Sequence, residues 1–520
     1  MRRTPFAVAL LAAACSPPAG GPPSPSPVPP GASPITSEAL RRDLVIFASD
    51  SFRGRETGTP GELRGARFLV ERLSDAAGIE PAGDSGFYQL VPLVRRAFGP
   101  ATRIAVARPG GETRIAIGAS ALPLLTLGPG APSPRLRARG DLVFAGYGVS
   151  IPELGRDDLA GLDVAGKAVV IVNGAPAGVD SARRAMLQSQ AMIGERIGQL
   201  VARGPAAIII MLTGEFGEEF EENVAQLLTT ITPPSPTPEV PDSLRQLPMI
   251  ILGIPAPGSP LLPAGWPEDD RPQVLEGRTF DARVDVERQD ITGYNVVAVV
   301  RGGDPAYNES YVAFGSHLDH IGIQPPVNGD SIGNGADDDG SGSVTQLAVA
   351  KAIAAAPDRP RRSVLFVWHS AEEKGLLGSS WFTAHPTVPL DSIVAQINAD
   401  MIGRNSPDSL YIVGPEAAPE GQSMVLGTIV DSVNAALATP FAFNREWDSA
   451  THPERIYFRS DHYNYAVRGI PVVFFTSGLH DDYHKVSDEV GKIDYDKMAR
   501  VGALLYDIGI ALGNRRTRPR

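Results

Sequence analysis

The chain of 520 residues has a single cysteine, Cys15, and no histidine in its first 316 residues. One cysteine excludes a disulfide within the chain, so core packing and bound metal must stabilise the fold. The missing histidines exclude a trypsin-like catalytic triad around the stretch Gly83–Gly86, because in that chain order a histidine precedes the serine. All 8 histidines lie at or after position 317, and any histidine-dependent chemistry must lie there.

Basic residues are fewer than acidic ones, 47 against 59, which gives a formal net charge of −12. This balance argues against a nucleic-acid binder, since neutralising phosphates requires basic patches. A chain of this length with 43% hydrophobic residues can bury a large core and divide into two or three domains. We therefore expect a globular protein with no nucleic-acid partner.

The N-terminus carries two arginines, an apolar run over 6–14 and then Cys15, a pattern typical of a secretory signal. The run is too short to span a bilayer as a stable helix. A cysteine at this place resembles a bacterial lipoprotein cleavage site; the alternative is an ordinary signal cleaved nearby, with Cys15 incidental. Residues 16–35, rich in Pro, Ser and Gly, predict a disordered tether. We expect an exported protein, periplasmic or at the cell surface, anchored by lipid to a bacterial membrane.

Beyond the tether, apolar spacing predicts two helices, the first after Thr36 and the second after a Gly/Pro break at 54–61. Residues 100–285 change to β-rich segments punctuated by Pro and Gly, which indicates an inserted domain with one helix at about 183–203. The sequence then alternates short apolar strands with helices; we expect strands at 295–300, 311–315, 363–368, 393–397 and 471–475.

Unbroken apolar strands imply a sheet covered on both faces. We therefore predict an α/β fold, with a mixed, mostly parallel sheet covered by helices on both faces. This domain would comprise residues 36–99 and 286–520, interrupted by the β-rich insert.

Side chains suited to metal binding follow these strands or begin the helix at about 343–356: His317, Asp338, Glu372, Glu373, Asp400 and His484. In covered sheets, ligands bind at the carboxyl ends of the strands. Imidazole nitrogen and carboxylate oxygen suit zinc, and two zinc ions sharing one carboxylate can hold a hydroxide between them. Without counter-ions the converging carboxylates would repel one another and take up protons. The set predicts two Zn²⁺ ions per chain and a hydrolase.

The remaining acids and histidines near this set have a plainer interpretation. Asp337 and Asp339 are expected to be loop or helix-cap acids. Surface or supporting positions are expected for His320, His369, His385, His452 and His480. Of these, His480 is the nearest rival of His484.

Several motifs together resemble the co-catalytic di-zinc exopeptidases, which include bacterial leucyl aminopeptidases, glutamate carboxypeptidases and glutaminyl cyclases. They are His317-Leu318-Asp319, Gly335–Gly342, Ala371–Ser379, Asn398–Met401, Ser460-Asp461-His462 and His484–Asp488. The resemblance implies that Asp338 bridges both zinc ions. His317 and Asp400 would complete one site, and Glu373 and His484 the other.

The resemblance also implies roles for three further residues. Glu372 would be the general base, and Asp319 would bind the other nitrogen of His317 and fix its tautomer. Tyr457 matches in spacing a family tyrosine that hydrogen-bonds the developing oxyanion, with a packed loop aromatic as the alternative. The family usually has asparagine where this chain has Asp339. The insert resembles a protease-associated domain through Gly146-Tyr147-Gly148 and Asp158–Lys167.

The function expected first is a zinc aminopeptidase that acts on peptides with a free N-terminus through a zinc-bridging hydroxide. A dipeptidase or carboxypeptidase of the same fold is the main alternative, and it would require Arg or Lys facing a substrate carboxylate. A glutaminyl cyclase, which uses one zinc, and a non-catalytic receptor-like scaffold are further alternatives. The receptor-like relatives lose metal ligands, whereas this chain has all of them.

Overall fold

The structure is a computed structural model. It describes residues 35–519 except 119, 126–133, 215, 219, 221–223, 225–226, 235–246, 257 and 417–420. From Ile35 onward the chain forms one compact unit. The expected signal sequence, Cys15 and nearly all of the expected tether lie outside the described residues and stay predictions.

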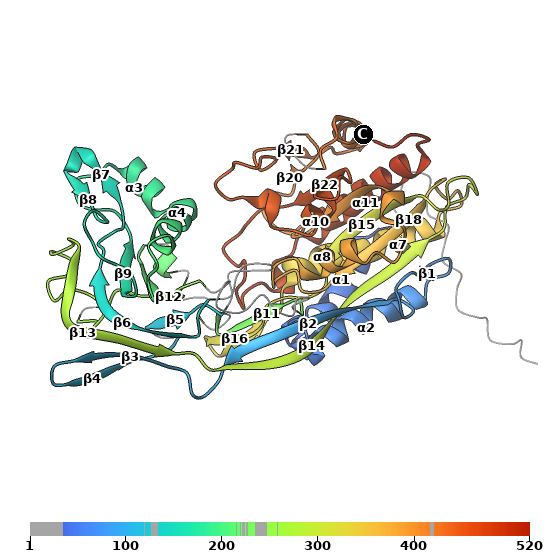
Figure 1. The fold of residues 1–520 in the computed structure, drawn as a ribbon. Coiled ribbons are helices and arrows are strands. Elements are labelled where there is room, and N and C mark those ends of the chain that lie inside the picture. Colours follow the sequence, from blue (N-terminus) through green and yellow to red (C-terminus); the bar gives the residue numbers. More distant parts are fainter. Residues whose placement is uncertain are drawn as a thin grey trace, which may run out of the picture. The chain divides into compact units, whose positions relative to one another are not determined.

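A 10-stranded mixed sheet forms the larger layer (Figure 1). Its strand order is β11 (Thr229–Thr232), β2 (Tyr88–Phe98), β14 (Val286–Val300), β18 (Ser363–His369), β15 (Tyr311–His317), β19 (Ile393–Ala399), β22 (Val472–Thr476), β20 (Ser409–Val413) and β21 (Ala442–Asn444), with β1 (Glu80–Pro81) paired to β14. The central strands β18, β15, β19 and β22 run parallel. Strands β2 and β14 pair with antiparallel neighbours, while β20 pairs antiparallel with β22 and parallel with β21, so the longest parallel stretch is the centre of the sheet.

Both faces of this sheet are buried, which explains the unbroken apolar strands. Along β14, Val296 and Ala298 belong to one core, while Val297 and Val299 belong to the other. Successive side chains of a strand point to opposite faces, so each face needs its own apolar residues. The predicted α/β fold class is confirmed.

Helices cover the two faces (Figure 1). One core packs against α1 (Ser37–Phe47), α2 (Pro60–Ser74), α7 (Gly342–Ala355), α9 (Met424–Ala436) and α11 (Tyr495–Asn514). The opposite core takes in Phe382 of α8 (Leu377–Ala384) and Tyr465 of α10 (His462–Ala466). Helix α2 begins where the sequence indicates, with Thr59 accepting the N–H of Gly61 and Pro60 in the first turn.

The predicted insert contains a second, 8-stranded sheet. Its order is β4 (Gly111–Ile115), β3 (Arg103–Arg108), β13 (Gln273–Arg283), β6 (Arg137–Phe144), β9 (Ala168–Asn173), β10 (Ala207–Leu212), β12 (Met249–Gly253) and β5 (Ala121–Pro123). Two clusters of buried apolar residues form the core around this sheet. One segment of the insert range, β11, instead pairs with β2 at the edge of the larger sheet.

The helix expected at about 183–203 is two helices, α3 (Ser181–Gln188) and α4 (Gln190–Val201). Ser189 separates them and accepts the N–H of Met192, so it caps the second helix. Two short hairpins complete the strands: β7 (Ser150–Ile151) with β8 (Arg156–Asp157), and β16 (Gly322–Val327) with β17 (Asp330–Gly333).

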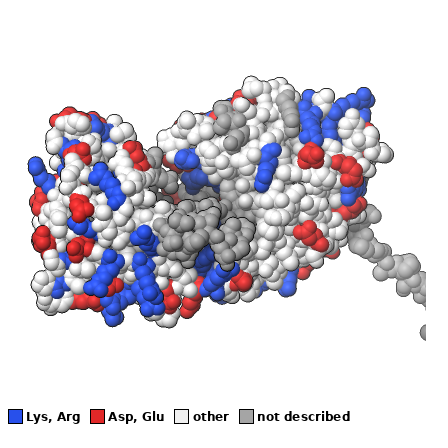
Figure 2. Space-filling model, viewed as in Figure 1, with Lys and Arg blue, Asp and Glu red and all other residues white. Residues whose placement is uncertain are grey.

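Within the described residues, none of the helices combines the length and apolar character that crossing a membrane requires. On the face shown in Figure 2, basic and acidic side chains are interspersed.

Candidate metal centre and adjoining pocket

The parallel strands deliver the candidate ligands to one edge of the sheet. Strand β15 ends at His317, and its neighbour β19 ends immediately before Asp400. On the other side, β18 ends at His369, shortly before Glu372 and Glu373. Asp338 lies in the tight turn that precedes α7. Because carboxyl ends of parallel strands share an edge, residues distant in sequence converge there.

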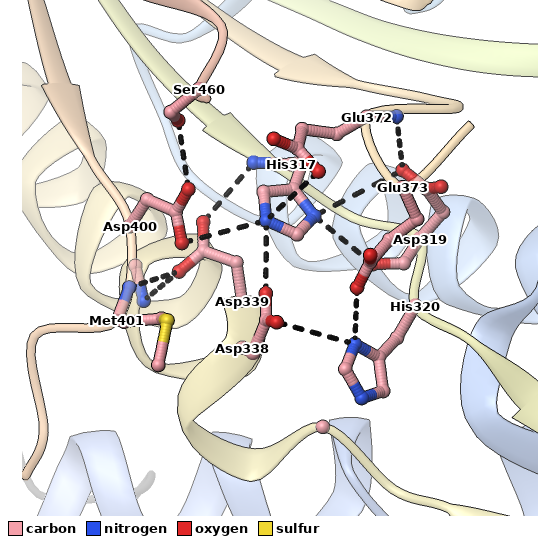
Figure 3. A network of polar contacts seen from close by, with 12 residues as sticks. His317, Asp319, His320, Asp338, Asp339, Glu372, Glu373, Asp400, Met401 and Ser460 are labelled. Atoms are coloured by element: carbon pink, nitrogen blue, oxygen red, sulfur yellow. Dashed lines mark hydrogen bonds and ion pairs between the residues drawn. The ribbon is translucent and has the colours of Figure 1, made fainter. Parts of the chain in front are cut away.

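Asp338 lies between two histidines. Its Oδ1 is 3.2 Å from Nε2 of His317, and its Oδ2 is 3.3 Å from Nε2 of His484. One carboxylate thus presents a different oxygen to each imidazole, as a residue shared by two metal ions must. Figure 3 shows His317 and Asp338 facing each other inside the network.

The other candidate ligands fall on either side of Asp338. Oδ1 of Asp400 is 3.5 Å from Nε2 of His317, while Oε2 of Glu373 is 3.0 Å from Nε2 of His484. The second oxygen of Asp400 accepts a hydrogen bond from the Ser460 hydroxyl at 2.7 Å. This grouping is the one that the motifs imply.

His320, expected at the surface or in a supporting position, is fully buried inside the network. Its Nδ1 is 2.7 Å from Oε1 of Glu373 and 3.8 Å from Oδ2 of Asp338 (Figure 3). With those two acids it forms a group that could hold a metal ion. The sequence signal was its place three residues after His317, where the chain turns back from the strand end. His320 is a candidate ligand that the sequence interpretation passed over.

Asp339 supports the site through hydrogen bonds from the backbone. Its Oδ2 accepts the backbone N–H of His317 at 3.1 Å, and its Oδ1 accepts those of Gly342 and Met401 at 2.9 and 3.2 Å. The bond to Gly342 is the one expected of a helix-cap acid. With both oxygens engaged by backbone, Asp339 is a poorer metal ligand than Asp338, although it lies near His317 and Asp400.

The charges in this cluster need additional positive charge. Burial lowers the pKa of His317, but Glu372 and Asp400 outweigh burial and raise this pKa well above its usual value. For His484 too, Glu373 and Asp338 outweigh burial and raise the pKa to about 10. Burial and the neighbouring acids raise the pKa of Glu372 well above its usual value. The acids can therefore stay ionised together only if protonated histidines or bound metal ions supply positive charge.

The donor set fits zinc. Oδ2 of Asp338 and Oδ1 of Asp400 are buried and make no hydrogen bond of good geometry within the described part of the chain, although imidazole nitrogens lie 3.3 and 3.5 Å away. Buried carboxylate oxygens without donors are costly unless a cation binds them. Three carboxylates and two or three imidazoles provide the oxygen and nitrogen ligands that zinc prefers.

Asp319 differs in detail from its expected role. Nδ1 of His317 lies 3.1 Å from the backbone carbonyl oxygen of Asp319 but 4.0 Å from its carboxylate. The carboxylate instead accepts the backbone N–H of Glu372 at 3.1 Å and the hydroxyl of Thr57 at 2.8 Å. The main chain of Asp319 orients the histidine, and its side chain orients the segment with the glutamates.

Two further candidates, His480 and Tyr457, have surroundings that differ from those of the candidate ligands. His480 lies 3.2 Å from Asp337, whereas His484 contacts Glu373 and Asp338. Tyr457 is fully buried, and its ring packs against Phe458, His462 and Tyr463. It is not among the described residues that line the adjoining pocket, so its oxyanion role stays a prediction.

An open pocket adjoins the cluster. His317, Asp338, Glu372 and Asp400 form one side. The rest is mainly apolar and aromatic: Met401, Trp447, Ile456, Phe474, Leu479 and Tyr483. Arg459, which the sequence interpretation did not single out, also lines it.

Comparison with solved structures supports the fold. The fold resembles the aminopeptidase from Aneurinibacillus sp. strain AM-1, with a TM-score of 0.58 and 16% identity over 94% of this chain and 96% of that one. It also resembles BSAP, a zinc aminopeptidase from Bacillus subtilis, with a TM-score of 0.53 and 18% identity over 92% and 95% of the two chains. The chain thus shares with these two structures a fold of mixed sheets flanked by helices.

Residues 295–508 match Peptidase family M28, and this stretch contains every candidate ligand. In this stretch the chain is similar to the M28 peptidases.

Two curated relatives are similar to part of the chain. Leupeptin-inactivating enzyme 1 of Streptomyces exfoliatus is 33% identical over 202 residues, 39% of each protein. A probable leucine aminopeptidase 2 of Aspergillus oryzae is 32% identical over 196 residues, 37% of this chain and 35% of the relative. The chain thus spans little more than a third of the length of these curated relatives.

Proposed function

We propose that this chain is an exported, zinc-dependent aminopeptidase that releases the first residue of peptides with a free N-terminus. The observation that carries the proposal is the position of Asp338, whose two oxygens face His317 and His484 beside a pocket that Glu372 lines. The match of residues 295–508 to Peptidase family M28 and the names of the relatives, which include leucine aminopeptidases, support the same activity.

Two zinc ions would share Asp338. His317 and Asp400 would hold the first, and Glu373 and His484 the second, with His320 available beside Glu373. Zinc bound there supplies Lewis acidity and lowers the pKa of a bound water to roughly 7.

Glu372 is suited to move the proton. Its side chain is 10% exposed and lines the pocket, and its Oε2 is 4.0 Å from Nε2 of His317. Because it is not needed as a ligand, its carboxylate can accept a proton from the attacking water and return it to the leaving amine nitrogen. A positioned general base contributes about 10²–10⁴ in rate.

The free N-terminal amine of a peptide would be held by the negative charge of Glu372. Two zinc ions would more than neutralise Asp338, Glu373 and Asp400, whereas Glu372 is not a ligand and keeps its charge at the pocket. An ammonium group is attracted to such a carboxylate, and the first carbonyl then lies next to the metal centre. A buried acidic site of this kind disfavours a substrate bound only by its C-terminal end.

A dipeptidase or carboxypeptidase stays the second candidate, because Arg459 in the pocket is a cation that could face a carboxylate. The intact ligand set argues against a receptor-like scaffold, and a second metal site argues against a glutaminyl cyclase.

We also propose export through the N-terminal signal, lipid attachment at Cys15 and a protease-associated domain at 100–285. The insert leaves and rejoins the larger sheet at adjacent positions, since Phe98 pairs with Val286 and the N–H of Gly99 bonds to the carbonyl of Asp285. Replacing the insert by a short turn should therefore leave a folded, zinc-binding domain, although β2 loses its edge neighbour β11. A zinc-free or unfolded product would contradict this division.

The activity is tested by incubating the purified protein with a panel of aminoacyl anilides and with blocked peptides. Hydrolysis of the anilides should disappear with a zinc chelator and return when zinc is added back. Hydrolysis unaffected by removal of the metal, as measured by elemental analysis of the same sample, would contradict the proposal.

A further inference from the structure

Arg459 gives the wall of the pocket a positive charge. Among the described residues that line the pocket it is the sole lysine or arginine, and Trp447, Ile456 and Phe474 provide apolar surface beside it. Glu372, on the side of the metal centre, carries the opposite charge. The pocket lining therefore combines acidic groups of the metal centre and one basic group with mainly apolar walls.

The partners of Arg459 within the chain leave much of its guanidinium for another ligand. Its Nη2 donates to the hydroxyl of Tyr483 at 3.2 Å. Its Nη1 is 3.9 Å from a carboxylate oxygen of Glu454, whose side chain is 52% exposed while that of Arg459 is 38% exposed. An exposed pair at this distance contributes little, and a guanidinium has five N–H donors in a planar fork that suits a carboxylate.

We propose that Arg459 binds a carboxylate of the substrate, so that the pocket selects peptides with a negative group near the scissile bond. This inference rests on the proposed function. Two sources supply that group: the side chain of an acidic first residue, or the C-terminal carboxylate of a dipeptide. Both offer an anion to the guanidinium of Arg459, and both gain a charge-assisted hydrogen bond.

A second role for Arg459 must be separated from this one. The hydroxyl of Tyr483 accepts the hydrogen bond from Arg459. The ring of Tyr483 stacks on the imidazole of His484, with centroids 3.8 Å apart and planes inclined by 22°. Arg459 could thus act through Tyr483 on the orientation of a zinc ligand. Such a positioning role would slow every substrate equally, whereas carboxylate binding changes only the preference for charged substrates.

The test compares substrate pairs that differ only in charge. Glutamyl and glutaminyl anilides test the side-chain source, and Leu-Gly and its C-terminal amide test the terminal source. The zinc-loaded full chain is measured as wild type, as Arg459→Gln and as Tyr483→Phe, which keeps the guanidinium and the stacked ring but removes the hydroxyl between them.

In the wild type, kcat/KM should favour the charged member of one pair by about ten- to hundredfold, the value of a hydrogen bond to a charged group. Arg459→Gln should reduce that ratio to near one, and Tyr483→Phe should preserve it. The pair that responds identifies the source of the carboxylate. If neither pair shows a preference, or if the ratio survives in Arg459→Gln, the proposal is overturned.

Failure of the proposed function gives a different result. If the wild type hydrolyses none of these compounds, calorimetric binding of the same four compounds is compared between the wild type and Arg459→Gln. Tighter binding of a charged member that Arg459→Gln abolishes supports the carboxylate site without the peptidase activity. Equal binding of both members overturns the site as well.

Discussion

Oδ1 of Asp319 lies 3.1 Å from the backbone nitrogen of Glu372 and accepts its N–H. The same residue offers its backbone carbonyl to Nδ1 of His317 at 3.1 Å. One residue thus orients a candidate zinc ligand and the segment that carries the candidate base. Loss of a group that hydrogen-bonds to a metal ligand typically costs about 10–100-fold in metal affinity or activity.

Asp319→Asn is expected to lower kcat by about 10–100-fold, because its amide cannot accept both the N–H of Glu372 and the hydroxyl of Thr57 as the carboxylate does. Thr57→Val is the matched control, since it removes the hydroxyl donor and keeps the hydrogen bond from the backbone N–H of Glu372 to the carboxylate of Asp319. It should cost much less activity. Steady-state kinetics on one anilide substrate decide the point, and equal rates for wild type and Asp319→Asn would contradict it.

Glu372→Gln is expected to retain both zinc ions and to lose about 10²–10⁴ in kcat, because the amide cannot accept the proton. Glu373→Gln is the matched comparison, and it should lose zinc because Glu373 contacts His484 at 3.0 Å. Elemental analysis of both variants separates base from ligand. Loss of zinc from Glu372→Gln, or near-normal turnover, would show that the two roles are wrongly assigned.

Arg55 is expected to be essential for the stability of the metal centre. It is fully buried and donates to backbone carbonyls of Phe47, Leu318, Asn334 and Gly335. Two of these carbonyls lie in the segment just before Asp338, and a third follows His317. Arg55→Met leaves them without donors and should lower the free energy of unfolding by about 3 kcal/mol or more.

The control for Arg55 is its exposed neighbour Arg53, for which Arg53→Met should change the free energy of unfolding by about 0.5 kcal/mol or less. Urea unfolding and zinc content are measured on both variants. Similar values for the two would show that Arg55 does not support the site.

Acid should destabilise the fold through His462. Burial lowers the pKa of His462 from 6.5 to about 3, and its ring stacks on that of Phe474 at 4.7 Å. Below pH 6.5 the unfolded chain binds a proton at this residue that the folded chain does not, so this contribution to stability falls as pH decreases towards 3.

His462→Phe keeps an aromatic ring and removes the titration. Between pH 7 and pH 5 the wild type should therefore lose about 2 kcal/mol relative to the variant. Urea unfolding of both proteins in chelator at the two pH values removes the effect of metal loss. A difference between the proteins that is the same at both pH values would rule out His462 as the acid-sensitive group.

The sequence predicts the sheet well because burial on both faces leaves unbroken apolar runs. The strands ending at His317 and His369, and the one before Asp400, lie where such runs end. Metal-binding side chains at strand ends were recognisable for the same reason.

Other features depend on contacts that no local pattern records. Arg55 binds carbonyls more than 260 residues away along the chain, and a carbonyl has no sequence signature. His320 reaches Glu373 only because the chain turns after its strand. Ser189 divided a predicted helix, and its preference for helix N-caps was the signal available.

The central claim is tested most directly by comparing a peptide with its N-acetylated twin, each incubated with the zinc-loaded protein. Acetylation removes the charge that the carboxylate of Glu372 is proposed to attract and changes nothing at the C-terminus. We expect the free peptide to lose its first residue and the acetylated peptide to remain intact, as followed by mass spectrometry. Equal cleavage of both would contradict an aminopeptidase and favour a carboxypeptidase that recognises the C-terminal carboxylate.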